Sequence, residues 1–388
     1  MKRGKVVEKL MGTKACIEDG GQLETVMESS CFSKPKRIRG MCIAILVGFF
    51  WVCLGACGQG PEVFQTTKPL MGTVVTISVV SQDARRAYEA LETAFDEIAR
   101  LEAMMSVFRE ESEVSRVNRE ASQHPVPVSE ELFQVIEMSL SLSEITHGAF
   151  DITVGPLMTL WPFYKKDKIL PSPHALQEAL SNVGYRRLVV SPRERSVFFS
   201  TAGMALDLGG IAKGFAIDRA VAVLKDHGMA AALVNAGGDI FAYGTKPDGQ
   251  PWRIGLQHPR DPQTLLAVLS LTDRAVVTSG DYQRYFLKDG KRYSHIVDPR
   301  NGFTAQETAS VTVIADRAAY ADALATGILV LGVKEGMALV ESLPGVHALI
   351  VKEGENRGLD LYVSRGFPQT LDEAFLASQG VKLIPVDR

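Results

Sequence analysis

The sequence predicts an α+β fold in which a mixed, largely antiparallel sheet is flanked by helices and follows an N-terminal lipoprotein signal. Short runs rich in Val, Ile and Thr recur along the chain, and in its second half several of them are separated only by turns. Across 388 residues, 46% hydrophobic content and a net charge of −3 are typical of a globular protein. No basic, aromatic-rich patch is present, so we expect no nucleic-acid partner.

Residues 1–56 are interpreted as an upstream extension followed by a lipoprotein signal peptide. Basic residues at 34–39 precede an apolar run at 41–54, and small residues then lead to Cys57. The run is short for a membrane span, so cleavage before Cys57 and its acylation is favoured over a permanent span. We expect an exported protein that is lipid-anchored to the cell membrane and faces the periplasm or the outside.

All five cysteines lie at or before Cys57, so the domain that follows has no disulfide and no thiol catalyst. A polar tether is predicted over residues 57–68, and one domain over residues 69–388.

The first half of this domain is predicted to mix strands and helices. A β-rich run at 73–80 is followed by a long amphipathic helix that opens at Ser81. A second helix is predicted to be capped by Ser129 and stopped by Gly148. A hairpin is predicted over 187–200, and shorter helices at 112–118 and 173–182.

The second half is predicted to consist mainly of strands. They are expected at 231–234, 252–256, 265–271, 275–278, 285–287, 293–296, 310–315, 346–352 and 359–364, with Asp289-Gly290 as a hairpin turn. A helix carrying 321–327 is predicted to be capped by Asp316, and the chain is expected to end in a polar tail.

The stretch at 204–215 is the first candidate for ligand binding. A β-like run ends at Asp207, and Gly209-Gly210 and Lys213 follow at the start of a helix, an arrangement that can hold a phosphate. The alternative is an ordinary strand-to-helix turn with a solvated lysine. A second strand-to-glycine turn, at Gly237-Gly238, indicates that both turns approach one ligand.

Three further candidate sites contain residues that could bind a ligand or take part in catalysis. Asp322 and Thr326 lie one turn apart on an apolar helix, which indicates a hard cation such as Mg²⁺; alternatively, Thr326 bonds back to a carbonyl and Asp322 pairs elsewhere. Asp151 lies in an apolar run and is either a helix cap or a ligand contact. His295 ends a strand before a loop that could cover a ligand, although a lone histidine is more often structural.

Taken in order, the motifs resemble those of the FAD:protein FMN transferases, the ApbE family of flavin transferases, from Met71 to about Gly332. The motifs are 71–73, 106–108, 148–151, 207–214, 235–239, 294–299 and 321–326. The resemblance implies an ApbE/T-fold-like fold, with FAD as substrate. It implies FAD contacts from Met71, Phe108, Ala149, Phe150, Asp151, Asp207, Lys213, Gly237, Gly238, His295 and Ile296, and a Mg²⁺ site made by Asp322, Thr326 and the carbonyl of Gly210.

At Phe108 the family often has tyrosine, so ring stacking would be kept here and a phenol hydroxyl lost. The implied reaction is Mg²⁺-dependent transfer of FMN from FAD to a Thr or Ser hydroxyl of a client protein, which leaves a phosphoester-linked FMN and releases AMP. His295 and Asp322 are the candidate catalytic residues. Implied clients are flavin-bearing subunits of membrane redox complexes. The alternatives are an FAD pyrophosphatase that gives FMN and AMP, and a non-catalytic flavin-binding lipoprotein.

Overall fold

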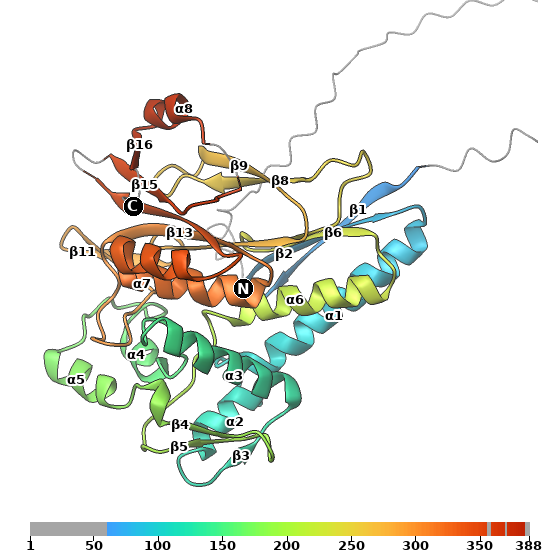
Figure 1. Cartoon of the computed structure of the whole chain (residues 1–388). Helices are drawn as coiled ribbons and strands as arrows, with labels where there is room; N and C mark the ends of the chain where they lie inside the picture. The colour runs from blue at the N-terminus through green and yellow to red at the C-terminus, as the bar shows by residue number, and fades with distance from the viewer. Residues whose placement is uncertain (1–59, 355–357, 369–370, 385–388) are drawn as a thin grey trace, which may run out of the picture.

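The computed structural model describes residues 60–354, 358–368 and 371–384 (Figure 1). The predicted signal peptide and Cys57 lie outside these residues.

A nine-stranded sheet forms the centre of the molecule. Its strand order is β1-β2-β6-β7-β10-β13-β14-β15-β16, and only the β15–β16 pair is parallel. The predicted α+β class with a largely antiparallel sheet is therefore confirmed. The strands are β1 (Glu62–Leu70), β2 (Thr73–Ser81), β6 (Ala231–Ala236), β7 (Asp239–Tyr243), β10 (Arg274–Gly280), β13 (Thr308–Ala315), β14 (His347–Glu353), β15 (Leu359–Val363) and β16 (Val381–Ile384).

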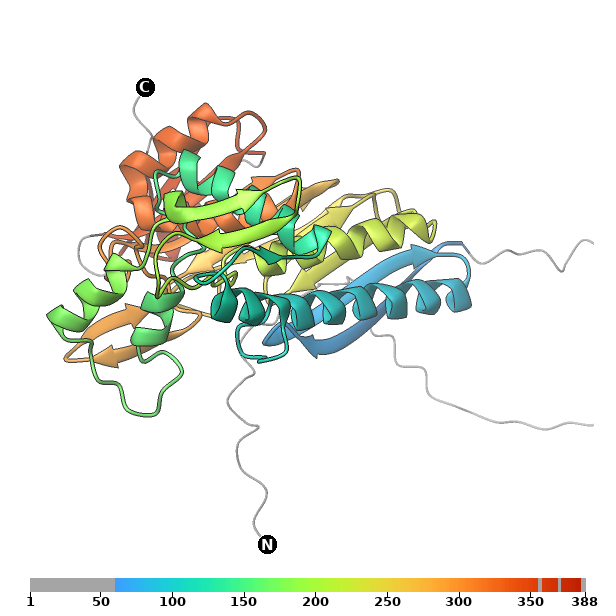
Figure 2. The ribbon, with the colours of Figure 1, turned by 90° about the horizontal axis from the view of Figure 1, so that it is seen from below.

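Three helices cover one face of this sheet, namely α1 (Ala84–Met105), α6 (Ala212–Asp226) and α7 (Ala318–Ser342). Seen from below, α1 runs along β1 and β2 beside α6 (Figure 2). The apolar stripe predicted for α1 is buried as expected. By length and composition α7 could span a membrane, but half of its most apolar 18-residue stretch is buried, and it packs on α6, β10 and β13. Its apolar residues therefore belong to the core between the helices and the sheet.

The opposite face carries a second apolar cluster. A two-stranded sheet of β8 (Trp252–Gln257) and β9 (Leu265–Leu271) lies there, and α8 (Glu373–Ser378) packs on β16 (Figure 1). The alternating buried and exposed residues of β8 are those of a strand with one face in the core.

Most of the remaining elements lie on the helical side, below the sheet in Figure 1. They are α2 (Glu113–Glu120), β3 (Val126–Pro127), α3 (Glu130–Ile145), α4 (Gly155–Leu160), α5 (Pro173–Ser181), the 3₁₀ turn η1 (Tyr185–Arg187), β4 (Leu188–Ser191) and β5 (Ser196–Phe199). The hairpin of β11 (Tyr285–Lys288) and β12 (Lys291–Ser294) lies at the left of the same view. The Asp289-Gly290 turn is confirmed, since both residues have positive φ.

Several sequence expectations were wrong. Most of the predicted tether belongs to β1, an edge strand whose residues alternate between exposed and half-buried, so its polar composition resembles that of a linker. The run before Asp207 joins no sheet and makes only one isolated bridge, from Ala205 to Val154. The predicted polar C-terminal tail contains α8 and β16.

Asp316 does not cap α7. Its carboxylate pairs with Arg274 instead, and the first N–H groups of α7 donate to Asp218 of α6, from Ala318 at 2.7 Å and Ala319 at 3.0 Å. Asp218 of α6 therefore caps α7, a role that the sequence had assigned to Asp316.

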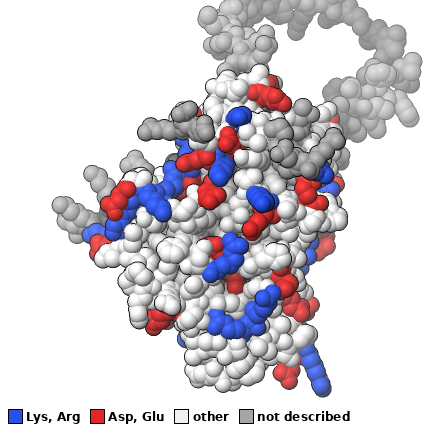
Figure 3. Space-filling view, turned by 60° about the vertical axis from the view of Figure 1, so that its left-hand side comes forward, with Lys and Arg blue, Asp and Glu red and all other residues white. Residues whose placement is uncertain are grey.

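Charged side chains of both signs are interspersed on the face drawn in Figure 3. The small net charge is therefore not gathered into a single-sign patch on that face.

Candidate active site

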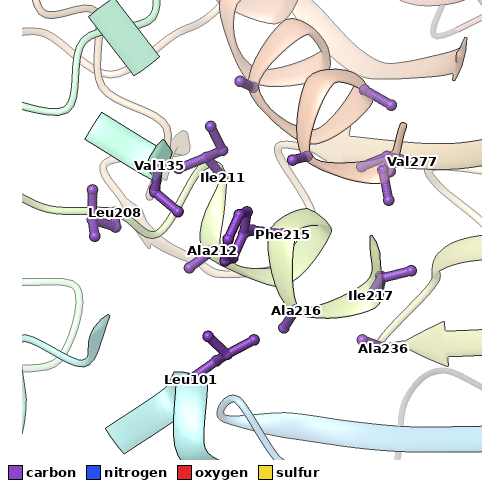
Figure 4. Packing of buried hydrophobic residues seen from close by; sticks show 14 of the residues in the cluster. Leu101, Val135, Leu208, Ile211, Ala212, Phe215, Ala216, Ile217, Ala236 and Val277 are labelled. Carbon is purple, nitrogen blue, oxygen red and sulfur yellow. The ribbon is translucent and has the colours of Figure 1, made fainter. Parts of the chain in front are cut away.

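The start of α6 is anchored deep in the core. Phe215, one turn into the helix, lies among apolar side chains from α1, α3 and the sheet, including Leu101, Val135 and Val277 (Figure 4). This packing fixes the direction of the first turn, and therefore the position from which Lys213 leaves the helix.

Lys213 forms an ion pair with Asp239, the first residue of β7. Asp239 is fully buried and also accepts the N–H of Thr278 at 3.4 Å. Burial lowers the pKa of the Lys213 ammonium, but the charges of Asp239 and Asp322 outweigh burial and hold the pKa above its usual value. Lys213 is therefore a fixed positive charge. In the sequence, Asp239 is marked only by its place directly after Gly237-Gly238.

Asp322 is held at the crossing of α6 and α7. Its Oδ2 accepts the backbone N–H of Gly214 at 3.0 Å. The helices touch here, since a Cβ on Gly214 would lie 2.3 Å from the carbonyl oxygen of Ala318. Burial, together with the neighbouring Asp239 carboxylate and against the opposing charge of Lys213, raises the pKa of Asp322 to about 7. A buried carboxylate with this raised pKa is poised for a cation.

The other two predicted metal ligands lie together. A Cβ on Gly210 would be 3.4 Å from the Thr326 hydroxyl oxygen, which in turn lies 3.2 Å from the hydroxyl oxygen of Ser279. Among the described residues, no cluster of three or more His, Cys, Asp or Glu could hold a metal ion. A set of one carboxylate, one hydroxyl and one carbonyl uses only the hard oxygen donors that suit Mg²⁺, so these residues fit that ion.

The predicted second glycine turn lies against the turn between β1 and β2. A Cβ on Gly237 would approach the Thr73 hydroxyl to 2.3 Å, whereas one on Gly238 would meet nothing within 4 Å. Both glycines have positive φ, as do Met71 and Gly72 in the neighbouring turn. The structure thus brings Met71, Gly237 and Gly238 to one edge of the sheet, with open space beside Gly238.

His295 follows β12, and both its backbone N–H, at 2.9 Å, and its Nδ1, at 3.2 Å, face the carbonyl oxygen of Arg284. A proton on Nδ1 would satisfy this contact and leave Nε2 as an acceptor. Burial, with help from the charge of Arg284, lowers the pKa of His295 to about 4, so the ring is neutral at pH 7. The adjacent Ile296 is buried in the main core.

Asp151 is neither a helix cap nor exposed. One carboxylate oxygen accepts the N–H and the hydroxyl of Thr153, both at 2.7 Å, and the other accepts the N–H of Tyr185 at 2.8 Å, which joins the loop before α4 to η1. Burial raises the pKa of Asp151 above its usual value. The nearest helix starts at Gly155, with Val154 as its N-cap residue.

Ala149 and Phe150 are also buried. The Phe150 ring packs against Gly210, since a Cβ on Gly210 would lie 3.2 Å from a carbon of that ring. The carboxylate of Asp207 accepts a hydrogen bond from the N–H of Gly209 at 2.8 Å, and burial raises the pKa of Asp207. Asp207 thus shapes the loop that leads to Gly210.

Phe108 is 72% exposed and makes an edge-to-face contact with Tyr164, with 5.2 Å between ring centroids. Arg284 donates a hydrogen bond to the Tyr164 hydroxyl at 3.1 Å. Sequence reasoning missed both Tyr164 and Arg284. The aromatic run Trp161-Pro162-Phe163-Tyr164 was the available signal for Tyr164, but it lies in a segment for which the sequence analysis predicts no helix, strand or site.

A family model described as the ApbE family matches residues 71–350, which is more than half of the chain. The chain belongs to the ApbE family. The match runs from the turn before β2 into β14, so β15, α8 and β16 lie beyond it.

Relatives of this ApbE family member are similar over most of their length. A protein of Treponema pallidum named FAD:protein FMN transferase is 36% identical over 84% of this chain and 92% of its own length. One of the same name from Vibrio cholerae is 33% identical over 82% of this chain and 96% of its own.

Solved structures carry the same fold. The ApbE protein of Thermotoga maritima superposes with a TM-score of 0.74 at 36% identity and covers 79% of this chain and 98% of its own. The flavin transferase ApbE from Vibrio cholerae gives a TM-score of 0.72 at 31% identity, over 79% and 99%.

Proposed function

We propose that this ApbE family member is an FAD:protein FMN transferase that uses Mg²⁺ to move FMN from FAD onto a Thr or Ser hydroxyl of a client protein and releases AMP. The relatives from Treponema pallidum and Vibrio cholerae that bear this enzyme name are matched by this chain over 92% and 96% of their own length. The observation that carries the proposal is the meeting of Lys213, Asp322 and Thr326 at the start of α6, where a positive charge and hard oxygen donors face one region.

Each group has a task that suits a pyrophosphate. The glycine turns at Gly210 and Gly238 let backbone approach phosphate oxygens, and Lys213 supplies charge beside them. Asp322, Thr326 and the Gly210 carbonyl would hold the metal. Mg²⁺ bound there would offset the negative charge that develops as the pyrophosphate bond breaks.

In the transfer, the client hydroxyl oxygen bonds to the phosphorus nearest riboflavin. The bond from that phosphorus to the bridging oxygen breaks, and AMP leaves with the bridging oxygen. The proton of the hydroxyl must be taken up, and Nε2 of His295 is the acceptor that this chain offers. The pKa of His295, about 4 in the protein alone, would rise beside the anionic substrate.

Acylation of Cys57 would tether this site to a membrane surface, because an acyl chain contributes about 0.8 kcal/mol per buried CH₂. The basic and apolar residues before Cys57 motivate this part of the proposal. Clients would then be flavin-bearing subunits of membrane redox complexes on the exported side. Loss of membrane association on Cys57→Ala, scored by fractionation, is the expected result, and unchanged association would refute the anchor.

The decisive experiment incubates the chain with FAD, Mg²⁺ and a candidate client. Covalent yellow client that survives denaturation, together with one AMP per flavin transferred, supports the transferase. Free FMN formed without client would indicate a pyrophosphatase, and unchanged FAD would indicate a binding protein. Asp322→Ala serves as the negative control. Omitting Mg²⁺ in the presence of a chelator tests the metal, and undiminished transfer would contradict its role.

A further inference from the structure

Two exposed aromatic side chains meet beside the site, although they come from loops far apart in sequence. Phe108 follows α1 and Tyr164 follows α4, and they are 72% and 55% exposed. Their rings meet edge to face, at 76° and 5.2 Å between centroids. Exposed aromatic surface held in a fixed geometry is a feature of ligand sites, since packing in the core does not account for it.

Arg284 fixes this pair to the rest of the site. Its Nη1 donates to the Tyr164 hydroxyl at 3.1 Å, and its Nη2 donates to the carbonyl of Gly72 at 3.2 Å. The guanidinium also lies 6.0 Å from the Tyr164 ring centroid. One arginine therefore ties the loop after α4 to the turn between β1 and β2.

This arrangement lies at the rim of the proposed nucleotide site. Gly72 is next to Met71 and Thr73, and Thr73 is the residue on which the Gly237 turn packs. The carbonyl of Arg284 is also the group that faces His295. The aromatic pair is thus connected, through two backbone turns, to the glycines and the histidine of the site.

We propose that Tyr164 binds the flavin ring of FAD beside Phe108, and that Arg284 is a positioning residue that holds Tyr164 in place. The inference rests on the proposed function, because it takes FAD as the substrate. A flat, polar aromatic ring fits a wall built from two aromatic side chains, one of which carries a hydroxyl. Tyr164 would also supply, from another loop, the phenol group that Phe108 lacks.

The test compares the binding of two probes to the full chain by calorimetry. FAD contains the flavin ring, whereas ADP-ribose keeps the adenosine diphosphate part without it. We expect Tyr164→Phe to weaken FAD binding about 5-fold through the lost hydrogen bond, and Tyr164→Ala to weaken it about 30-fold. Arg284→Gln should resemble Tyr164→Phe. None of the three should change ADP-ribose binding.

Tyr88→Phe is the matched control. Tyr88 of α1 is 50% exposed and makes an edge-to-face contact with Phe64 of β1. The Tyr88→Phe variant should leave both probes unaffected. FAD binding by Tyr164→Ala equal to wild type would overturn the inference, as would equal losses for FAD and ADP-ribose. If Arg284→Gln, and neither Tyr164 variant, lost affinity equally for FAD and for ADP-ribose, Arg284 would bind the pyrophosphate directly and would have no positioning role.

Binding and transfer are scored separately, so the two proposals can fail independently. A wild-type chain that binds FAD but transfers no FMN would refute the proposed function, while the binding series still decides the role of Tyr164. A wild-type chain that binds no FAD would refute both.

Discussion

Gly214 of α6 donates its backbone N–H to the carboxylate of Asp322 in α7, and four residues further along α6 Asp218 accepts the N–H of Ala318. Ala318 in turn lies four residues before Asp322. The two helices are therefore joined by two hydrogen bonds, one turn apart, that run in opposite directions. This bracing places the proposed metal ligand Asp322 directly against the helix that carries Lys213.

Asp322 and Lys213 are predicted to act on different steps. Asp322→Ala should abolish transfer, with a fall of at least about 100-fold, and weaken FAD binding less, because it removes the metal ligand. Lys213→Ala should act first on FAD affinity, since it removes a charge beside the pyrophosphate and leaves Asp239 buried and unpaired. Calorimetric FAD binding and covalent flavin transfer are to be measured on the same preparations. Full Mg²⁺-dependent transfer by Asp322→Ala would disprove the link between α6 and α7.

Asp218 is predicted to stabilise the protein by capping α7 across the helix interface. Asp218→Ala should lower the free energy of unfolding by about 1–2 kcal/mol, since it leaves two helix N–H groups without partners. Denaturant unfolding measures this. Asp316→Ala is the matched control, because Asp316 is the adjacent residue expected from sequence to be the cap, and its exposed pair with Arg274 should contribute less than about 1 kcal/mol. A larger loss for Asp316→Ala than for Asp218→Ala would reverse the assignment.

The two glycines of the second turn are predicted to respond differently to a methyl group. Gly237→Ala should destabilise the fold by roughly 2–3 kcal/mol, because φ is +66° and the new Cβ would clash with Thr73. Gly238→Ala meets no atom within 4 Å, so only backbone strain of roughly 1–2 kcal/mol is expected. We expect FAD to occupy the space beside Gly238. Gly238→Ala should therefore lose more FAD affinity than Gly237→Ala for the same loss of stability. Thermal unfolding and FAD titration separate the two effects.

His295 is predicted to set the acid limit of the free enzyme. Burial lowers its pKa to about 4 in the folded protein, so kcat/KM for FAD at saturating Mg²⁺ should not fall with a midpoint near 6.5, the value of an unperturbed histidine. The folded state binds this proton less readily than the unfolded state. The contribution of neutral, buried His295 to the free energy of unfolding is therefore complete above about pH 6.5 and is lost as the pH falls towards 4. An acid limb at pH 6.5 that vanishes in His295→Ala would contradict the lowered pKa.

Much of the fold could be predicted because its signals are local. The apolar stripe of α1, the Ser129 cap of α3 and the Asp289-Gly290 hairpin each depend on residues within a few positions of one another. The buried strand β7 was missed, although it directly follows the Gly237-Gly238 turn. Its place is set by pairing with β6 and with β10, which lies more than thirty residues further along the chain.

For the site, the sequence by itself determined which residue types are present and in what order: a lysine and a double glycine at a helix start, a carboxylate and a hydroxyl one turn apart, and a histidine before a loop. It also determined the family resemblance, which the comparisons bear out. The tertiary structure alone decided the partners. Lys213 pairs with Asp239, Asp218 caps α7, and Tyr164 meets Phe108. Each pair joins segments separated by at least 26 residues, and side-chain spacing along a chain carries no information about contacts that only the packing of the whole sheet and its helices creates.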